Sequence, residues 1–318
     1  MSISAVILNY NDSEGTIASV ERIKDFSIFN FIVVVDNCSS DESVRDISAY
    51  LKMLNESASC SENPRSENPR FILIENDKNG GYGYGNNCGI NYSREILGCT
   101  HAVVANPDSI FCETDISAML DVFCQEEKTA VVGAVMREKD SGISYEEFIS
   151  SAWPLRSAVK YIAYAGPVLK RLFKNSLNYG RAYFETARKT TAKGNTYIEA
   201  EAVHGSLLMV DTEKFAKCGG YDEQVFLYCE EDILAQRIKR QGFRSFCILD
   251  KGYYHEGSHT ISKNGNNAIK RQRFRQESER YYMEKYLEAG AFRKMLFSFI
   301  QKIVLIETWL MAKMGILG

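Results

Sequence analysis

Two acidic stretches have residue types suited to phosphate or hydroxyl chemistry. The first is Asn106-Pro107-Asp108, which directly follows the apolar run at residues 101–105. Pro107 cannot donate a ladder hydrogen bond, so a strand should end there and leave Asp108 at its carboxyl end, where open α/β sheets bind ligands. Asp108 could hold Mg²⁺ or Mn²⁺ together with substrate phosphates, or it could be only a local cap of the turn.

The second acidic stretch, Glu230-Glu231-Asp232, begins a helix that the apolar spacing predicts within residues 226–243. Gly242 suits the end of that helix. Acids in a first turn favour the positive end of the helix dipole, which is one reason for their position. One of them could instead be a general base that accepts a proton from a hydroxyl nucleophile. The spacing leaves both interpretations open.

A histidine and a glycine-rich run also follow predicted strands. His255 comes after a strand at residues 246–249, and it could bind metal or phosphate or be a hydrogen-bonded surface group. The run at residues 79–87 does not fit a dinucleotide fingerprint, which needs a glycine where Asn86 or Cys88 stands. We expect its glycines to let the backbone approach a ligand, with the next helix N-terminus offering N–H groups to phosphate.

Apolar runs alternate with helical patterns in the part of the chain that positions these residues. Strands are predicted at residues 4–9, 29–36, 71–75 and 101–105, separated by helices at 14–25, at 41–54 and up to residue 97. This alternation is typical of a parallel, doubly wound sheet. Further on we expect a helix at 115–126 and strands at 130–136, 203–210 and 246–249. Residues 138–197 have no clear periodicity.

Composition narrows the class of protein. A net charge of −3 over 318 residues argues against a nucleic-acid binder. Nine scattered cysteines without a CxxC pair indicate free thiols in a reducing cytoplasm, and no signal peptide is expected. The repeated SENPR at residues 61–70 predicts a mobile surface loop.

Two helices are predicted from residue 268 to about residue 314. The apolar arc of the second is too wide for a solvated helix and too interrupted by charge to span a membrane. It could pack on the catalytic domain or on a second subunit, which we favour slightly. It could instead lie on the inner membrane surface, where its basic residues would meet anionic lipid.

These segments, in this order, resemble a family 2 glycosyltransferase with the GT-A fold. The resemblance rests on VILNYN (6–11), VVVDNCSSD (33–41), NGGYGYGNNCGI (79–90), ANPDS (105–109), HGSLLMV (204–210), GGYDEQVFLYCEED (219–232) and HEGSH (255–259). It implies a Rossmann-like α/β catalytic domain at 1–262, with a mostly parallel central sheet and flanking helices, and a C-terminal helical extension at 263–318. Within the domain it implies a nucleotide-binding half at 1–112, a variable segment at 138–197 and an acceptor-binding, catalytic half at 198–262.

The resemblance also implies an activity. It is the inverting transfer of a sugar from a UDP- or dTDP-linked donor to a hydroxyl of a glycan or lipid-linked glycan, in cell-surface polysaccharide synthesis. Asp108 matches the last acid of the DXD metal motif, whose first position is Asn106 here, as in rhamnosyltransferase-like members. With His255, the later metal-side histidine, it would hold Mg²⁺ or Mn²⁺. Counting back from the glycine of the R-x-G-[YF] ending puts Glu231 at the base position, with Asp232 and Glu230 beside it.

The implied donor site consists of Asn9, Tyr10, Asn11, Asp36, Asn79, Gly81, Asn87, Asn106 and Asp108. His204 and Gly205 would form an acceptor and donor loop. Two other interpretations rank lower. A sugar nucleotidyltransferase would need a glycine-rich, basic loop after the first strand, and no Lys or Arg occurs there before Arg22. A non-catalytic sugar-nucleotide or glycan-binding module would not depend on Glu231 or Asp232.

Overall fold

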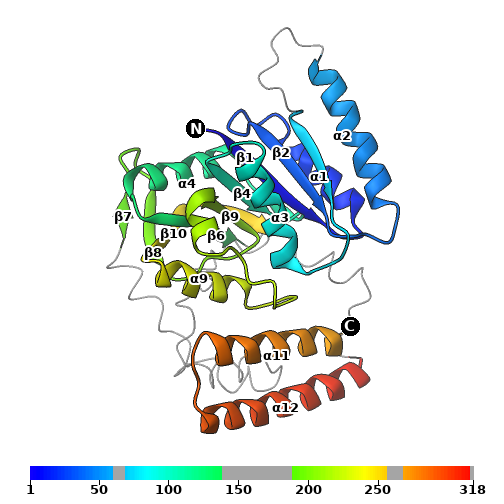
Figure 1. Cartoon of the computed structure of the whole chain (residues 1–318), viewed down its shortest axis with the longest axis vertical. Coiled ribbons are helices and arrows are strands. Elements are labelled where there is room, and N and C mark those ends of the chain that lie inside the picture. Colours follow the sequence, from blue (N-terminus) through cyan, green and yellow to red (C-terminus); the bar gives the residue numbers. More distant parts are fainter. Residues whose placement is uncertain (60–68, 138–187, 256–267, 316–318) are drawn as a thin grey trace.

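A computed structural model describes residues 1–59, 69–137, 188–255 and 268–315. The predicted SENPR loop, most of the segment at 138–197 and the expected domain boundary at 262/263 lie outside these residues. The described strands form one sheet in the order β3-β2-β1-β4-β9-β6-β10-β8-β7, and β5 pairs with β10 (Figure 1). The strands are β1 (Ile3–Asn9), β2 (Phe31–Asp36), β3 (Phe71–Glu75), β4 (His101–Ala105), β5 (Ser109–Ile110), β6 (Thr129–Arg137), β7 (Lys189–Thr190), β8 (Thr196–Ala200), β9 (Leu207–Asp211) and β10 (Arg244–His255).

Helices cover both faces of the sheet, and its central strands are mostly apolar. The helices of the body are α1 (Ser13–Ile23), α2 (Ser43–Ser59), α3 (Tyr82–Glu95), α4 (Glu113–Gln125), α8 (Thr212–Lys217) and α9 (Glu230–Arg240). One core cluster joins the sheet to α1, α2 and α4, and a second joins its other face to α3, α8 and α9. Burial on both faces explains the continuous apolar runs of β1, β2 and β4.

The predicted α/β class is confirmed, but the sheet is mixed and not mostly parallel. The strands β3, β2, β1 and β4 are parallel, as the alternating pattern predicted. The strand β9 then enters antiparallel between β4 and β6. Strand β10 also extends to His255, past the predicted end at residue 249, through a register shift between Ile248 and Gly252. The periodicity of a buried strand does not encode its direction, which is why the sequence left this open.

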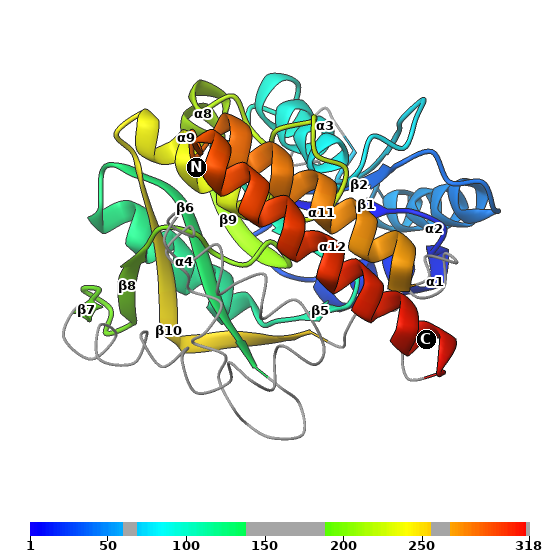
Figure 2. The same ribbon diagram turned by 90° about the horizontal axis from the view of Figure 1, so that it is seen from below.

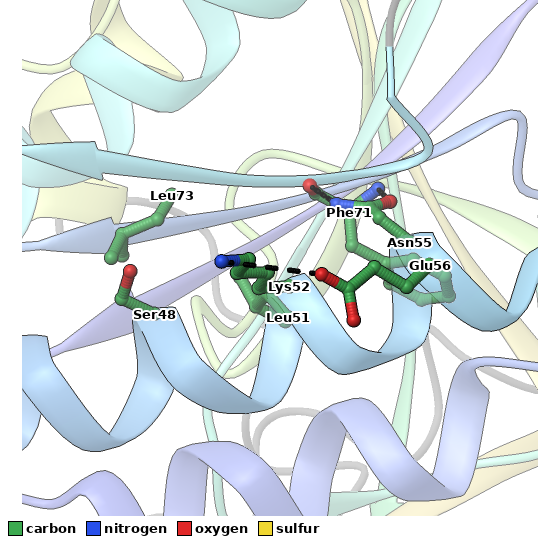
Figure 3. A pocket seen from close by; sticks show the side chains of 7 residues that line it. All are labelled: Ser48, Leu51, Lys52, Asn55, Glu56, Phe71 and Leu73. Atoms are coloured by element: carbon green, nitrogen blue, oxygen red, sulfur yellow. Dashed lines mark hydrogen bonds and ion pairs between the residues drawn. The ribbon is translucent and has the colours of Figure 1, made fainter. Parts of the chain in front are cut away.

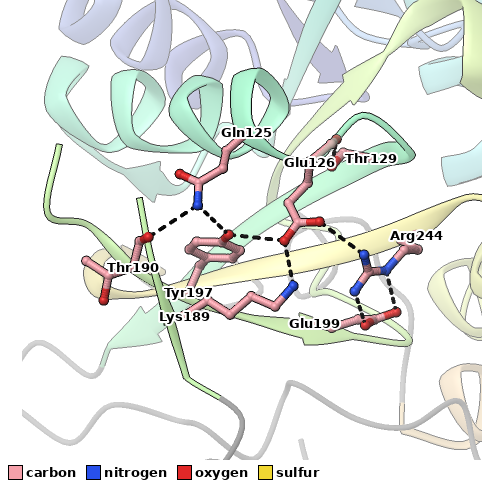
Figure 4. Close-up of polar contacts among 8 residues, drawn as sticks. All are labelled: Gln125, Glu126, Thr129, Lys189, Thr190, Tyr197, Glu199 and Arg244. Carbon is pink, nitrogen blue, oxygen red and sulfur yellow. Dashed lines mark hydrogen bonds and ion pairs between the residues drawn. The ribbon is translucent and has the colours of Figure 1, made fainter. Parts of the chain in front are cut away.

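The edge formed by β7 and β8 is attached to the body by a network of charged and aromatic groups (Figure 4). Glu126, after α4, accepts hydrogen bonds from Lys189 Nζ at 2.6 Å and from Arg244 Nη1 at 3.0 Å. Arg244 also pairs with Glu199 on β8. The network thus ties the end of α4 to β7, β8 and β10.

Two long helices follow the sheet, as predicted. Helix α11 (Ala268–Lys285) packs on residues 225–233, and α12 (Ala291–Lys313) packs on α11 (Figures 1 and 2). Tyr286 Oη donates to Asp222 Oδ2 at 2.6 Å, and Ser278 Oγ donates to Leu227 O at 2.7 Å. The segment that leads into α9 is therefore held by α11.

Stability should depend on pH through Glu279, which is buried between α11 and α12. Burial raises its pKa from 4.5 to about 7. The folded state thus keeps a proton that the unfolded state loses, so the stabilisation present below pH 4.5 is lost as the pH rises through 7. The shift corresponds to about 3 kcal/mol. We expect Glu279→Gln to remove this part of the pH dependence, measured as unfolding free energies at pH 5 and pH 8. Equal pH dependence in both proteins would contradict this assignment.

Candidate active site

Four segments meet at one end of β4, β9 and β10 and bring the predicted catalytic and metal-binding residues together. Asp108 Oδ1, in the turn after β4, lies 3.1 Å from His255 Nε2 at the end of β10. The ring of His204, before β9, lies 6.1 Å from that of His255. Glu231 Oε1, on α9, accepts a hydrogen bond from the N–H of Gly205 at 3.0 Å. Residues from positions 108, 204, 231 and 255 thus form one cluster.

The position of Asp108 follows from the end of β4. Strand β4 stops at Ala105, as Pro107 predicted, and the chain turns into β5. Ser109 then pairs directly with His255, in an antiparallel register that brings the neighbouring Asp108 to the histidine. Ser109 Oγ and the N–H of Asn106 both donate to Ser206 O, at 2.8 and 2.9 Å. The turn and the His204 loop are therefore held as one unit.

The three consecutive acids of α9 point into different surroundings. Glu230 is buried, and its Oε1 has no hydrogen-bond partner within the described residues. Burial and the neighbouring charge of Glu231 raise the pKa of Glu230 above its ordinary value, so this carboxyl is protonated at neutral pH. Asp232 lies on the side of α11, since Gln236, one helical turn further along α9, donates through Nε2 to Tyr282 Oη at 3.3 Å. Glu231 faces Gly205 and the cluster.

His204 is neutral in this arrangement. Burial lowers its pKa, and the charge of Glu231 opposes that shift only in part. The N–H of Ser206 donates to His204 Nδ1 at 3.2 Å, so Nε2 carries the ring proton. Tyr253 Oη lies 2.5 Å from Ser206 Oγ and 3.3 Å from His204 Nδ1. The histidine is thus fixed in orientation by its neighbours.

Asp108 and His255 suit a divalent cation that shares its ligands with a substrate. The described residues contain no group of three or more His, Cys, Asp or Glu side chains that could hold a metal ion. His255 Nε2 is buried and lies near Asp108 without an aligned hydrogen bond to any described residue. A carboxylate and an imidazole so placed could bind one cation, with phosphate oxygens and water as its remaining ligands. The residues therefore fit the predicted Mg²⁺ or Mn²⁺.

The predicted nucleotide-binding residues lie at the carboxyl ends of β1 and β2. Asp36 is buried and accepts hydrogen bonds from Asn9 Nδ2 at 2.7 Å and from the Ser39 hydroxyl and N–H. Asn11 has a φ of 52° and accepts a hydrogen bond from the N–H of Ser40. Asn9 and Asp36 thus shape the turn after β2, while Tyr10 and Asn11 are partly exposed at its rim.

Asn79 and Asn87, which were predicted to bind the nucleotide-sugar donor, make hydrogen bonds within the chain. Asn87 accepts from the N–H of Tyr221 at 2.9 Å and donates to Tyr221 O at 3.0 Å, so its amide joins α3 to the loop before α9. Asn79 Oδ1 accepts from the N–H of Gly81 and from Asn37 Nδ2. Both asparagines therefore have a structural role, in hydrogen bonds within the chain, that the sequence did not indicate.

The glycines after β3 have a role in packing that the sequence did not indicate. A Cβ on Gly81, whose φ is +91°, would lie 2.2 Å from Phe226 O. A Cβ on Gly85 or Gly89 would meet Leu8 or Val6 of β1 at 2.3 and 2.4 Å. The N–H of Tyr82 donates to Phe226 O instead of remaining open for a phosphate. The glycines therefore let α3 approach the chain itself, and a ligand contact at Gly81 stays a prediction.

Sequence reasoning missed Tyr82 and Tyr253. Tyr82 Oη donates to Gly205 O at 2.6 Å, on the residue whose N–H binds Glu231. No sequence signal separates it from Tyr84, which lies near Asp77 on the other side of α3. Arg22, the first basic residue after β1, donates to Pro107 O at 2.6 Å and so supports the turn of Asp108.

A groove of about 490 Å³ lies elsewhere, between α2 and the edge strand β3 (Figure 3). It is lined by Ser48, Leu51, Lys52, Asn55, Glu56, Phe71 and Leu73. Phe71 is the first residue of β3, so the groove reaches the amino end of that strand. It is separate from the cluster at the carboxyl ends.

Two solved structures resemble the fold. The mannosyltransferase PcManGT from Pyrobaculum calidifontis, solved with GDP-Man and Mn²⁺, has a TM-score of 0.57 at 12% identity, over 96% of this chain and 72% of that one. GalNAc-T7, solved with UDP, GalNAc and Mn²⁺, has a TM-score of 0.53 at 13% identity, over 80% of this chain and 44% of that one. At this identity they support the fold alone, and the chain has the GT-A fold.

Two curated glycosyltransferases are similar in sequence to part of this chain. The N-acetylglucosaminyl-diphospho-decaprenol L-rhamnosyltransferase of Mycobacterium tuberculosis (strain CDC 1551 / Oshkosh) is 24% identical over 204 residues, which are 61% of this chain and 62% of the relative. The low-salt glycan biosynthesis hexosyltransferase Agl10 of Haloferax volcanii is 24% identical over 75% of this chain and 62% of its own length. The chain therefore spans less than two thirds of these relatives.

The family is decided by a match to a family model. The model of the family described as glycosyl transferase family 2 matches residues 4–185, which is more than half of the chain. This range contains the ends of β1, β2 and β4, including Asp36 and Asp108. The chain belongs to glycosyl transferase family 2.

Proposed function

We propose that the protein transfers a sugar from a nucleotide-diphosphate donor to a hydroxyl of a glycan or lipid-linked glycan, with inversion at the anomeric carbon. The observation that carries the proposal is the cluster of Asp108, His204, Glu231 and His255. It combines a pair suited to a cation with a carboxylate that faces the same space. Family membership and the nucleotide-bound relatives support the donor class.

Glu231 is the proposed general base. A hydroxyl nucleophile must lose its proton as it attacks the anomeric carbon from the side opposite the leaving diphosphate, and a fixed carboxylate can accept that proton. The Gly205 N–H holds Glu231 Oε1, which leaves the second oxygen for the acceptor. Glu230 is unsuited because it is protonated at neutral pH, and Asp232 because it faces α11.

Asp108 and His255 would hold a divalent cation at the diphosphate. When bound, Mg²⁺ or Mn²⁺ would neutralise the charge that develops on the leaving group. The contact of Asp108 with His255 and its support by β5 keep both side chains in place before substrate arrives. Asn106 anchors the same turn through its backbone, so an amide at the first position of the motif is compatible with this role.

The proposal also specifies the chemical classes of the donor and the acceptor. Tyr10, Asn11 and the buried Asp36 lie at the strand ends where the base and ribose would bind. The rhamnosyltransferase relative acts on a diphospho-decaprenol acceptor, and we propose that this chain likewise uses a lipid-linked or polymeric glycan in cell-surface polysaccharide synthesis. A UDP- or dTDP-linked sugar is the expected donor.

Nucleotide binding gives the first test. We expect one of UDP, dTDP and GDP to raise the melting temperature in the presence of Mn²⁺, because a ligand that binds only the native state stabilises it by mass action. At a free concentration of 100 times Kd the expected gain is about 2.7 kcal/mol. Mn²⁺ alone and the nucleosides without phosphates are the controls. A shift of the same size with and without Mn²⁺ would contradict the proposed metal site. No shift with any nucleotide would contradict the assignment as a transferase.

A further inference from the structure

Helix α12 is oriented with its apolar side outward. The residues that it buries against α11 are Phe297, Gln301, Val304 and Thr308, which repeat at helical spacing. The opposite side carries large exposed apolar residues, namely Phe292, Met295, Leu296, Phe299, Ile303, Ile306, Trp309, Leu310 and Met314. Phe292 is 72% exposed and Phe299 is 62% exposed. We call this side the outer face of α12.

The inner side of α12 is half polar, because Gln301 and Thr308 are buried beside Phe297 and Val304, whereas a helix on a water-soluble domain usually turns its polar residues to the solvent. Gln276 Nε2 donates to Gln301 O at 2.6 Å, and Gln301 Nε2 donates to Gln276 O at 3.1 Å. Gln301 Nε2 also donates to Glu279 Oε2 at 3.0 Å. Thr308 donates its hydroxyl to Val304 O within the helix. The interface of the helix pair thus holds polar side chains beside Phe297 and Val304, while most of the large apolar side chains of α12 face the surroundings.

We propose that the outer face of α12 binds the surface of an anionic lipid bilayer, with the helix lying in the plane of the membrane. Contrary to the expectation from the sequence, α12 is long and apolar enough to span a bilayer by length and composition. It packs along α11, however, whose sequence AIKRQRFRQESERYYMEK is strongly charged, and a spanning α12 would draw those charges into the hydrocarbon. Figures 1 and 2 show the two helices side by side, with α12 farther from the sheet. The geometry therefore favours an in-plane helix.

Charge complementarity indicates that the lipid is anionic. Arg293, Lys302 and Lys313 are exposed on α12. Lys313 Nζ lies 4.7 Å from the ring of Trp309, a side chain that suits the boundary between headgroups and acyl chains. Lysine stems can lie along the apolar face while their ammonium groups reach phosphate headgroups. Each basic residue near an anionic surface strengthens binding by about fivefold.

A second copy of this chain is the competing occupant of the outer face. Lys302 lies at the middle of α12, which runs from Ala291 to Lys313. An antiparallel pairing of two α12 helices about a two-fold axis would bring the two Lys302 side chains together, and like charges in contact oppose such pairing. Anionic headgroups would instead neutralise this lysine.

Vesicle flotation tests the proposal without any sugar substrate, so its result does not depend on the transferase assignment. We expect the full chain to float with vesicles of phosphatidylcholine and phosphatidylglycerol, and more weakly with phosphatidylcholine alone or at high salt. The double variant Phe299→Gln/Ile306→Gln should weaken flotation by about tenfold or more. The matched control is Met53→Gln/Ile96→Gln, since these residues are 52% and 58% exposed on other elements.

Several outcomes would overturn the proposal. They are no flotation of the unaltered chain, equal flotation of the Phe299→Gln/Ile306→Gln variant, or equal weakening by the Met53→Gln/Ile96→Gln control. A lipid-free dimer in light scattering that the α12 variant dissociates would assign the outer face to a second copy. Circular dichroism of each variant checks that α12 is still folded. Lys302→Gln/Lys313→Gln should reduce flotation with anionic vesicles only, and an equal loss with neutral vesicles would contradict the charge argument.

Discussion

The Glu231→Gln variant should bind the nucleotide-sugar donor as the unaltered protein does and lose turnover by about 10²- to 10⁴-fold. The amide is nearly the same size as the carboxylate and can still accept the hydrogen bond that the Gly205 N–H now gives to Oε1. It cannot accept a proton from the acceptor hydroxyl. Turnover is measured as release of nucleoside diphosphate, with the donor whose nucleotide gives the largest thermal shift.

The neighbouring acids supply matched controls for this variant. Glu230→Gln replaces a buried carboxyl that is already neutral at pH 7, so we expect turnover to change by no more than about threefold. Asp232→Asn alters a side chain on the α11 side of the helix and should behave likewise. A larger loss in either control than in Glu231→Gln would reassign the base. Unchanged turnover in all three variants would contradict the assignment of the base to α9, whereas donor binding without turnover in the unaltered protein would favour the binding-module interpretation.

The second large effect is expected for Asp108→Asn. The variant removes the carboxylate nearest to His255 and should lower turnover by about 10²- to 10³-fold, the range found when a group that stabilises developing charge is lost. It should also abolish the part of the thermal shift with nucleotide that depends on Mn²⁺. Binding of nucleotide without metal should persist, because Tyr10, Asn11 and Asp36 lie at other strand ends.

Asp25→Asn is the control for the change in charge, since Asp25 lies on the surface beyond the end of α1. The melting temperature of Asp108→Asn without ligands shows how much of any loss comes from the broken contact with His255. A variant that keeps both its turnover and its Mn²⁺ response would remove Asp108 from the metal site. In that case the contact with His255 would have only a structural role.

Much of the fold could be predicted from the sequence, because local patterns carry it. The positions of β1, β2, β3 and β4 were predicted from their apolar runs. The proline after β4 predicted the end of that strand and so the position of Asp108. The acids of α9 fall at its start and Gly242, with a φ of +72°, follows its end, as predicted. Strand direction was not encoded: β9 reads as a buried strand whichever way it runs, and its antiparallel entry depends on contacts distant in the sequence.

The sequence by itself therefore determined the residue types of the candidate site and the strand ends and helix start that carry them. Only the tertiary structure decided which acid faces that site, because successive residues of a helix point about 100° apart and packing alone sets the rotation of α9. It likewise decided that the glycines of α3 meet Leu8 and Val6 of β1. On α12 it also decided that Gln301 faces inward and Phe299 outward, since Gln276 O and Glu279 Oε2 on α11 accept hydrogen bonds from the Gln301 side chain.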